Sequence, residues 1–345
     1  MIRSYSVRVD VLRHGATLTT LHPISDPSVD CESSGAIKAS MSGIFLDDPA
    51  VDWLTDELQP IQIIDGIEYP VGIFPIGTVA RSTDENGLHT VRVEAYDRCM
   101  ILNQTKTETI LHLSKGSNYI QVVEQLLTKA GITLYLTTKC REVLATDRED
   151  WRVGTPFLTI INTLLQEINY DPIWFDANGM AIVRPAKKPA ASNIDHAYGG
   201  TDDGLCVLER PNTVETDAFD TPNVFVAICN NPDLPAPLTA TAVNNNPLSA
   251  LSVLRRGRRI PTVLSVDNIP NQQALEDYAQ RKCADSMLAS ETVTISTANV
   301  PGHGVLDTVA LIHPDAEGIY QETGWNLILA PGQTMIHHLR RSILI

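Results

Sequence analysis

The spacing between apolar residues changes twice along the chain, and these changes limit the folds that it can adopt. Near the start, Val7, Val9 and Val11 alternate with Arg8 and Asp10. A period of two is typical of a strand with one buried face, and it recurs through the first hundred residues. This part of the chain therefore predicts a β-barrel or a β-sandwich.

A hairpin is expected within this first β-region. Asp65-Gly66 lies between the β-prone runs 61–64 and 67–69. Such a pair favours a tight turn between strands, because both turn residues adopt positive φ there.

A short helix is expected beside these strands. Asp48 is a suitable N-cap and Pro49 a suitable first residue for a helix that continues to Leu54. On such a helix Asp48, Asp52 and Asp56 share one face. We interpret this as a solvated acidic face rather than a cation site, which usually offers more oxygens and a glycine turn.

The period becomes helical near Thr107. Ser117 is expected to cap a first helix that ends at Gly131, and Thr155-Pro156 opens a second one. Each helix leads to a short strand, near 133–136 and near 172–175. The second strand runs into Asn178-Gly179, which predicts a turn back through 180–183.

Alternation returns from about Asn223. Residues 230–247 are rich in Pro and Asn and are expected to loop out, and Asn271 is expected to cap a long helix. The expected strands are 224–228, 262–266, 292–296, 308–312, 319–329 and 335–343.

These elements predict a mainly β fold with an α+β insert. The expected division is a first β-domain at 1–108, a small α/β domain at 109–203 and a second β-domain at 204–345. Each β-domain has one flanking helix, and part of 204–235 can alternatively return to the first. Pro- and Gly-rich stretches at 185–192 and 199–200 are the expected exit from the insert.

Charge excludes several classes of partner. The 41 acidic residues outnumber the 26 basic ones, which gives a formal net charge of -15. A chain this acidic repels phosphate backbones and anionic membranes, so specific binding to nucleic acid or a membrane is not expected. Its 345 residues, 43% of them hydrophobic, suffice for a core without disulfides or metal.

The cysteines show no CxxC pair and no short Cys/His spacing, so no zinc ribbon or finger is expected. We interpret them as buried free thiols made in a reducing compartment. No secretory signal and no apolar run of about 20 residues is seen, which favours synthesis in the cytoplasm without membrane insertion. The cysteines are Cys31, Cys99, Cys140, Cys206, Cys229 and Cys283.

Catalytic signatures are missing from the sequence, which has no GxSxG, HExxH or GxxxxGK[ST] motif. Gly302-His303-Gly304 begins like a dinucleotide fingerprint, but it lacks the third glycine and precedes a strand. We interpret it as a turn that leads into that strand. The chain is therefore predicted not to be an enzyme, with no catalytic residue and no cofactor.

Four histidines are candidate metal ligands. His337 and His338 are neighbours on an expected strand, so they point to opposite faces and cannot chelate one ion. No carboxylate lies at ligand spacing from His303 or His313. All four are expected at the surface or an interface, and no metal site is predicted.

One strongly basic run stands out in the acidic chain. It can be an exposed loop tip, or a contact with an acidic protein partner, including another copy of this chain, through bidentate bonds to carboxylates. The run consists of Arg255, Arg256, Arg258 and Arg259 around a central glycine.

Short motifs and the order of elements together suggest a family. The motifs are Val93-Glu94-Ala95-Tyr96-Asp97-Arg98, Gly131-Ile132, Trp174-Phe175-Asp176-Ala177-Asn178-Gly179, Val293-Thr294-Ile295-Ser296, Gly304-Val305-Leu306-Asp307-Thr308-Val309 and Trp325-Asn326-Leu327-Ile328-Leu329. In this order they resemble the baseplate hub proteins of contractile phage tails and phage-like particles, whose relatives include the late-control D proteins and the N-terminal part of VgrG spikes.

The resemblance implies two tail-tube-like β-barrels in one chain, separated by the α/β domain. Three chains would form a ring of six barrels that adapts a hexameric tail tube to a trimeric central spike. The implied partners are itself as a homotrimer, the tube protein, the spike, the tape-measure protein and other baseplate proteins. DNA would pass through the channel without specific binding. The implied location is the baseplate of a virion or tail-like particle, assembled in the bacterial host cytoplasm, with the spike and any hydrolase as separate proteins.

Two alternatives stay open. One is the tail-tip protein of a non-contractile phage, which has the same fold. The other is a carbohydrate-binding or carbohydrate-active β-protein, which is disfavoured because aromatic residues make up only 6% of the chain.

Overall fold

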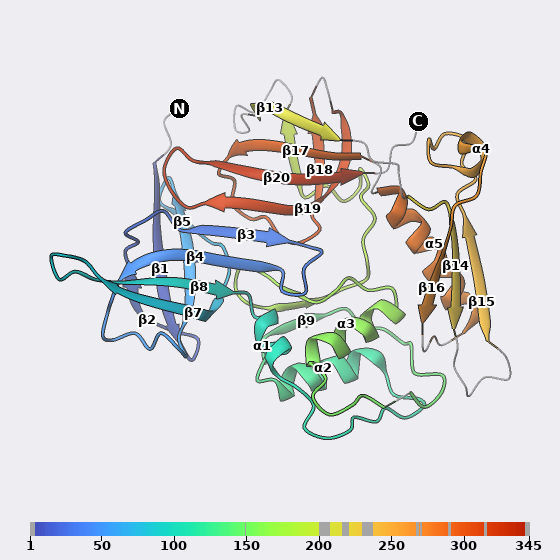
Figure 1. The fold of residues 1–345 in the computed structure, drawn as a ribbon, viewed down its shortest axis with the longest axis horizontal. Helices are drawn as coiled ribbons and strands as arrows, with labels where there is room; N and C mark the ends of the chain where they lie inside the picture. Colours follow the sequence, from blue (N-terminus) through green and yellow to red (C-terminus); the bar gives the residue numbers. More distant parts are fainter. Residues whose placement is uncertain are drawn as a thin grey trace.

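The computed structural model describes residues 4–148, 150–199, 208–215, 221–229, 237–266, 269, 271–288, 291–313 and 316–341. Strands make up most of the regular structure, and the helices gather below the strands and at one end of the molecule (Figure 1). The predicted mainly β fold with an α+β insert is confirmed. In the described part of the chain, no helix is long and apolar enough to cross a membrane.

The first group of strands, here the N-terminal strands, contains the predicted hairpin. Asp65 and Gly66 turn between β5 and β6 with φ of 51° and 81°, as the Asp-Gly signal requires. The N-terminal strands are β1 (Tyr5–Arg13), β2 (Ala16–Leu21), β3 (Ser28–Glu32), β4 (Ala39–Leu46), β5 (Glu57–Ile64), β6 (Ile67–Pro70), β7 (Phe74–Thr83) and β8 (His89–Tyr96).

A second group, here the C-terminal strands, continues the same sheet. Strand β19 pairs antiparallel with β3, and Trp325 lies opposite Cys31. The order along the sheet is β13-β17-β20-β19-β3-β4-β8-β7-β5-β1-β2, with β6, β12 and β18 off this path. The C-terminal strands are β12 (His196–Gly199), β13 (Leu208–Glu215), β17 (Glu291–Ala298), β18 (Thr308–Ile312), β19 (Gly318–Ile328) and β20 (Thr334–Arg341).

The largest hydrophobic core spans the junction between the two groups. It combines Val9, Phe45 and Val93 of the N-terminal strands with Trp325 and Met335 of the C-terminal strands, all at most 4% exposed. The two β-regions are therefore one packed body. Closure of each region into a barrel stays a prediction, as does the division at 1–108, 109–203 and 204–345.

The helical unit has its own core below the sheet (Figure 1). Its first long helix is capped by Asn118, whose side chain accepts a hydrogen bond from Gln121 N, one residue after the expected Ser117. The left-handed Gly131, with φ of 83°, follows its end as predicted. The unit consists of α1 (Cys99–Gln104), α2 (Tyr119–Lys129), β9 (Tyr135–Thr137), α3 (Phe157–Glu167), β10 (Trp174–Phe175) and β11 (Ala181–Val183).

Asp97 and Arg98 connect the sheet to this unit. The buried carboxylate of Asp97 accepts backbone N–H bonds from Lys38, Ala39 and Cys99. Arg98 donates two bonds to Glu57 and a third to the carbonyl of Gly179. The motif that ends the first β-region therefore holds strands β4 and β5 against the turn between β10 and β11.

A separate small sheet unit lies at one end of the molecule (Figure 1). Asn271 caps its long helix as predicted, since its side chain accepts from Ala274 N. The helix packs on β14 and β15 rather than on the C-terminal strands. Part of the segment expected to loop out is a strand, β15; residues 230–236 lie outside the described residues. The unit consists of β14 (Val224–Cys229), β15 (Leu238–Val243), α4 (Val253–Arg256), β16 (Pro261–Val266) and α5 (Gln272–Leu288).

The prediction of a helix over 48–54 was wrong, because these residues form turns. Asp48 accepts from the N–H of Ala50, and Asp52 accepts from the N–H of Leu54. Asp56 accepts from the N–H of Asp52 and is itself buried beside Arg13. Aspartates that satisfy nearby backbone donors compete with helix formation, so no shared acidic face arises.

Candidate functional site

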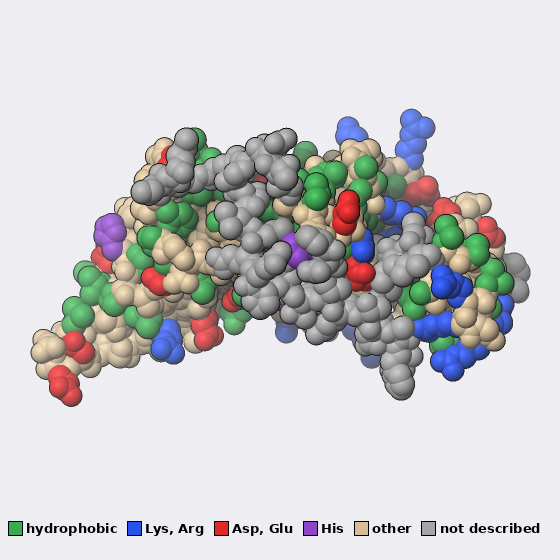
Figure 2. Space-filling view, turned by 90° about the horizontal axis from the view of Figure 1, so that it is seen from above, with side chains coloured by type: hydrophobic (Ala, Val, Ile, Leu, Met, Phe, Trp, Pro, Cys, Tyr) green, Lys and Arg blue, Asp and Glu red, His purple; other side chains and the backbone are tan. Residues whose placement is uncertain are grey.

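The arginine run lies at the surface of the small sheet unit. Ser252 caps α4 by accepting from Arg255 N, and Gly257 ends it with φ of 62°. Three of the four arginines are exposed, whereas Arg256 is half-buried and donates to the carbonyl of Thr221 at 2.9 Å. Basic side chains gather at this end of the molecule in Figure 2. A partner contact through Arg255, Arg256, Arg258 and Arg259 stays a prediction.

A buried cluster of histidines and carboxylates lies among the C-terminal strands. His303 is on the 299–307 loop between β17 and β18, Glu322 is on β19, and His337 is on β20. Glu322 lies opposite Leu339 on β20, so its side chain shares a face with His337, two residues away on that strand. The expectation that His303 and His337 lie at a surface or interface was therefore wrong.

Glu322 joins the two histidines. Its Oε2 lies 2.6 Å from His303 Nδ1, and its Oε1 lies 2.6 Å from His337 Nδ1. All three side chains are at most 1% exposed. The outer ring nitrogens also have partners, since His303 Nε2 is 2.6 Å from Tyr198 Oη and His337 Nε2 is 2.8 Å from Thr297 Oγ1.

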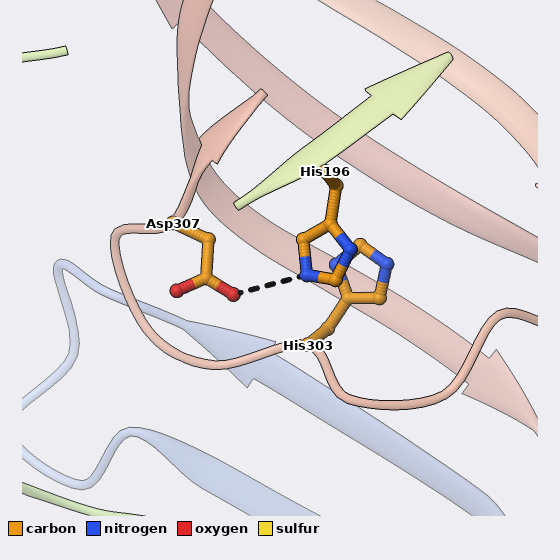
Figure 3. Close-up of side chains that lie close together, drawn as sticks. All are labelled: His196, His303 and Asp307. Atoms are coloured by element: carbon orange, nitrogen blue, oxygen red, sulfur yellow. Dashed lines mark ion pairs between the residues drawn. The ribbon is translucent and has the colours of Figure 1, made fainter. Parts of the chain in front are cut away.

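A second pair extends the cluster. His196, at the start of β12, stacks on the ring of His303 with centroids 3.8 Å apart, and its Nε2 lies 3.4 Å from Asp307 Oδ2 (Figure 3). Asp307 also accepts from the N–H of Gly304 at 2.7 Å. The 302–304 segment thus turns into β18, as expected, while it places His303 inside the protein.

Burial and hydrogen bonding act in opposite directions on the pKa values of the cluster. Burial would raise the pKa of Glu322, but its hydrogen bonds to His303 and His337 outweigh burial and lower it. Burial lowers the pKa of His337, and Glu322 does not reverse this. Burial also acts to lower the pKa of His196, yet the bond to Asp307 leaves it raised. Glu322 is therefore a carboxylate at neutral pH and His337 a neutral imidazole.

A cavity of about 380 Å³ adjoins the cluster. It lies where the N-terminal strands, the helical unit and the 299–307 loop meet. Its lining includes His196, His303 and Asp307 on one side and Lys38, Asp97 and Trp174 on others.

The close spacing of ligand atoms in this cluster makes metal binding chemically feasible. Two groups have ligand atoms within 4.8 Å of one another: His303 with Glu322 and His337, and His196 with His303 and Asp307. Sequence spacing hid the first group, because Glu322 lies on a strand away from both histidines. In the second group Asp307 follows His303 by four residues, so the expectation that no carboxylate lies at ligand spacing from His303 was wrong. Pairing the expected strands 319–329 and 335–343 as a hairpin would have brought Glu322 near His337.

His338 lies as expected, exposed on the face of β20 opposite His337. The described cysteines agree with expectation in part: Cys31, Cys99 and Cys283 are buried free thiols, Cys229 is buried, and Cys140 is half-buried and not buried as expected. Cys206 lies outside the described residues.

No family model matches the sequence, and no curated protein matches it. Three of the solved structures that match almost the whole chain are tail proteins. A tail protein from Neisseria meningitidis has 15% identity and a TM-score of 0.71 over 98% of both chains. The 43 kDa tail protein of prophage MuSo2 from Shewanella oneidensis has 11% identity and a TM-score of 0.68 over 99% of both.

The third match is the prophage tail protein gp18 from Listeria monocytogenes, with 12% identity and a TM-score of 0.59. It covers 97% of this chain and 95% of that chain. At these identities the similarity establishes the fold. The chain has the fold of these phage tail proteins, and the resemblance drawn from its short motifs is confirmed at that level.

Proposed function

We propose that the chain is a structural subunit of a phage tail or tail-like particle, and that it forms the hub of the baseplate. The observation that carries this proposal is the end-to-end match with two tail proteins, which covers 98–99% of each chain at TM-scores of 0.71 and 0.68. The same parts therefore occur in the same order, with no large part left over on either side. Fold alone does not fix function, so the position in the particle rests on the hub resemblance.

The hub is a ring of three chains between the tail tube and the central spike. Each chain contributes its N-terminal and C-terminal strands, which makes six β-regions around the axis. Within the described strands, β2 and β13 stand at the two ends of the sheet order. Edge strands favour pairing with another chain, and contact between copies in a closed ring avoids open filaments. Tube, spike, tape-measure and other baseplate proteins are the further partners.

The acidic charge suits a channel through which DNA passes. A net charge of -15 gives the ring a field that repels phosphate, so the genome does not adhere to its wall. The role is structural and needs no active site. A sugar-binding role is not supported, since none of the four tryptophans is exposed as a platform: Trp53, Trp174 and Trp325 are buried and Trp151 is half-buried.

A cryo-EM reconstruction of the assembled particle tests the proposal. We expect three copies around the tail axis, between tube and spike, with the first β-region of each chain beside the second β-region of its neighbour. The assembled particle is needed because a tube or spike partner can be required to close the ring. A dimer, a ring of six whole chains or a peripheral position would contradict the proposal. A particle without a sheath would instead identify the tail tip of a non-contractile phage.

A further inference from the structure

We propose that His303, Glu322 and His337 bind one zinc ion, which fastens the 299–307 loop to strands β19 and β20. This inference rests on residues of the single chain and is independent of the proposed place in the particle.

The donor set suits zinc. Zn²⁺ accepts imidazole nitrogen and carboxylate oxygen at about 2.0–2.2 Å, and a tetrahedral site holds its ligand atoms about 3.4 Å apart. The two contacts of Glu322 with the histidine Nδ1 atoms are 2.6 Å. Opening each by less than about 1 Å places the three donors around one ion.

The outer contacts of the histidines match those of metal ligands. A ligating histidine almost always donates its other ring N–H to a fixed acceptor, which sets the tautomer. His337 Nε2 has Thr297 Oγ1 at 2.8 Å, and the Thr297 hydroxyl can itself donate to the carbonyl of Ala298 at 2.7 Å. His303 Nε2 has the hydroxyl of Tyr198 at 2.6 Å.

The tautomer of His337 decides what its Nδ1 contact with Glu322 is. With a proton on Nδ1, His337 donates a hydrogen bond to the carboxylate at 2.6 Å. With its proton on Nε2 instead, the Nδ1 lone pair faces the carboxylate, and a cation between the two groups is then needed. A metal dication satisfies the Nδ1 lone pair and the carboxylate together, and the imidazole binds it in the neutral form.

The cavity borders the proposed site at His303. His303 lines the cavity and also belongs to the second group of close donors, with His196 and Asp307. With an ion bound, the loop would be joined to the sheet by coordinate bonds in addition to hydrogen bonds.

Metal titration of the purified chain tests the site. After treatment with EDTA, the chain is titrated with Co²⁺ and followed by visible absorption, and then with Zn²⁺ followed by calorimetry. We expect one equivalent of Co²⁺ with the absorption of a tetrahedral site, displaced by one equivalent of Zn²⁺. Saturating Zn²⁺ should also raise the melting temperature, because the ion binds the folded chain preferentially.

Three variants locate the site. His303→Gln and Glu322→Gln each remove a ligand. Loss of a hydrogen-bond partner of a ligand weakens metal binding by about 10–100-fold, and loss of a ligand itself should weaken it further. His338→Gln is the matched control, since His338 is the exposed neighbour of His337 on the same strand and should bind like the natural chain. Circular dichroism verifies that each variant is folded.

Three results would overturn the proposal. One is the lack of saturable one-equivalent binding by the natural chain. The second is unchanged binding in folded His303→Gln or Glu322→Gln, and the third is an equal loss of binding in the His338→Gln control. If the variants do not fold, X-ray absorption of the zinc-loaded natural chain decides: two imidazoles, one carboxylate and a solvent oxygen support the site, and any other set of protein ligands refutes it.

Discussion

Gly324 is the residue through which the close approach of β19 to β3 can be tested. It pairs with Glu32, and a Cβ placed on Gly324 would lie 2.7 Å from the backbone oxygen of Cys31. Ordinary contacts begin near 3.4 Å. Gly324→Ala must therefore displace one strand by about 0.7 Å, since a backbone carbonyl cannot rotate away as a flexible side chain can.

The cost can be estimated in two ways. An extra methyl group in a well-packed site destabilises by about 1–3 kcal/mol. If the strands instead separate locally, about two ladder hydrogen bonds at about 1 kcal/mol each are lost. Both routes lead to a decrease of about 2 kcal/mol in the free energy of unfolding for Gly324→Ala.

Asn326→Ala is the matched control on the same strand. It removes a contact with Asp30 and one with His338, both between exposed groups, and adds no atom near the backbone of β3. We expect it to change the free energy of unfolding by less than about 1 kcal/mol. Urea unfolding followed by tryptophan fluorescence measures both variants, with Trp325 next to the substituted glycine. A Gly324→Ala chain as stable as the natural one would refute the close approach and the reasoning built on it.

Three further results are expected. Limited proteolysis should cut first near 185–192 or 199–204, the exit of the helical unit, and first cuts inside 91–96 would contradict this boundary. Below about pH 4.5 the natural chain should lose stability more steeply than Glu322→Gln in acid unfolding. The lowered pKa of Glu322 stabilises the folded chain above the pKa of the unfolded chain, and this stabilisation is lost as the pH falls through the pKa of the folded chain. Parallel pH dependence in the two chains would exclude this contribution of Glu322. Serine substitution of the arginine run should leave the melting temperature nearly unchanged and weaken association with an acidic partner, more at low salt; a large drop in melting temperature with normal assembly would contradict the contact role. The substituted residues are Arg255, Arg256, Arg258 and Arg259.

Local chemistry was predictable where one short segment determines its own conformation. Asp65 and Gly66 adopt the two positive φ values that their turn requires, and β18 has the bounds expected from alternation. The segment from Asp48 to Leu54 shows the limit of this approach. An aspartate before a proline suits a helix N-cap and a series of aspartate turns equally well. Arg13, which pairs with Asp56 and donates to the carbonyl of Ala50 in the turn structure, comes from β1, far away in the sequence.

Contacts between distant segments were not predictable from spacing. Nothing in the alternation of 28–32 or 318–328 indicates that these strands pair, since period two defines faces and not neighbours. The same limit hid the cluster around Glu322. The residues near His303 and His337 in the sequence do not reveal their carboxylate partner. That partner, Glu322, lies on β19, which only the sheet register brings next to the two histidines.

The pairing of β3 with β19 has a consequence for synthesis of the chain. During synthesis of the chain, the edge of β3 stays open until residues 318–328 have emerged from the ribosome. An open edge invites pairing with other nascent chains, and such long-range closure is slow. A chain that terminates before residue 318 therefore lacks the β3–β19 junction and keeps an open strand edge, which favours aggregation.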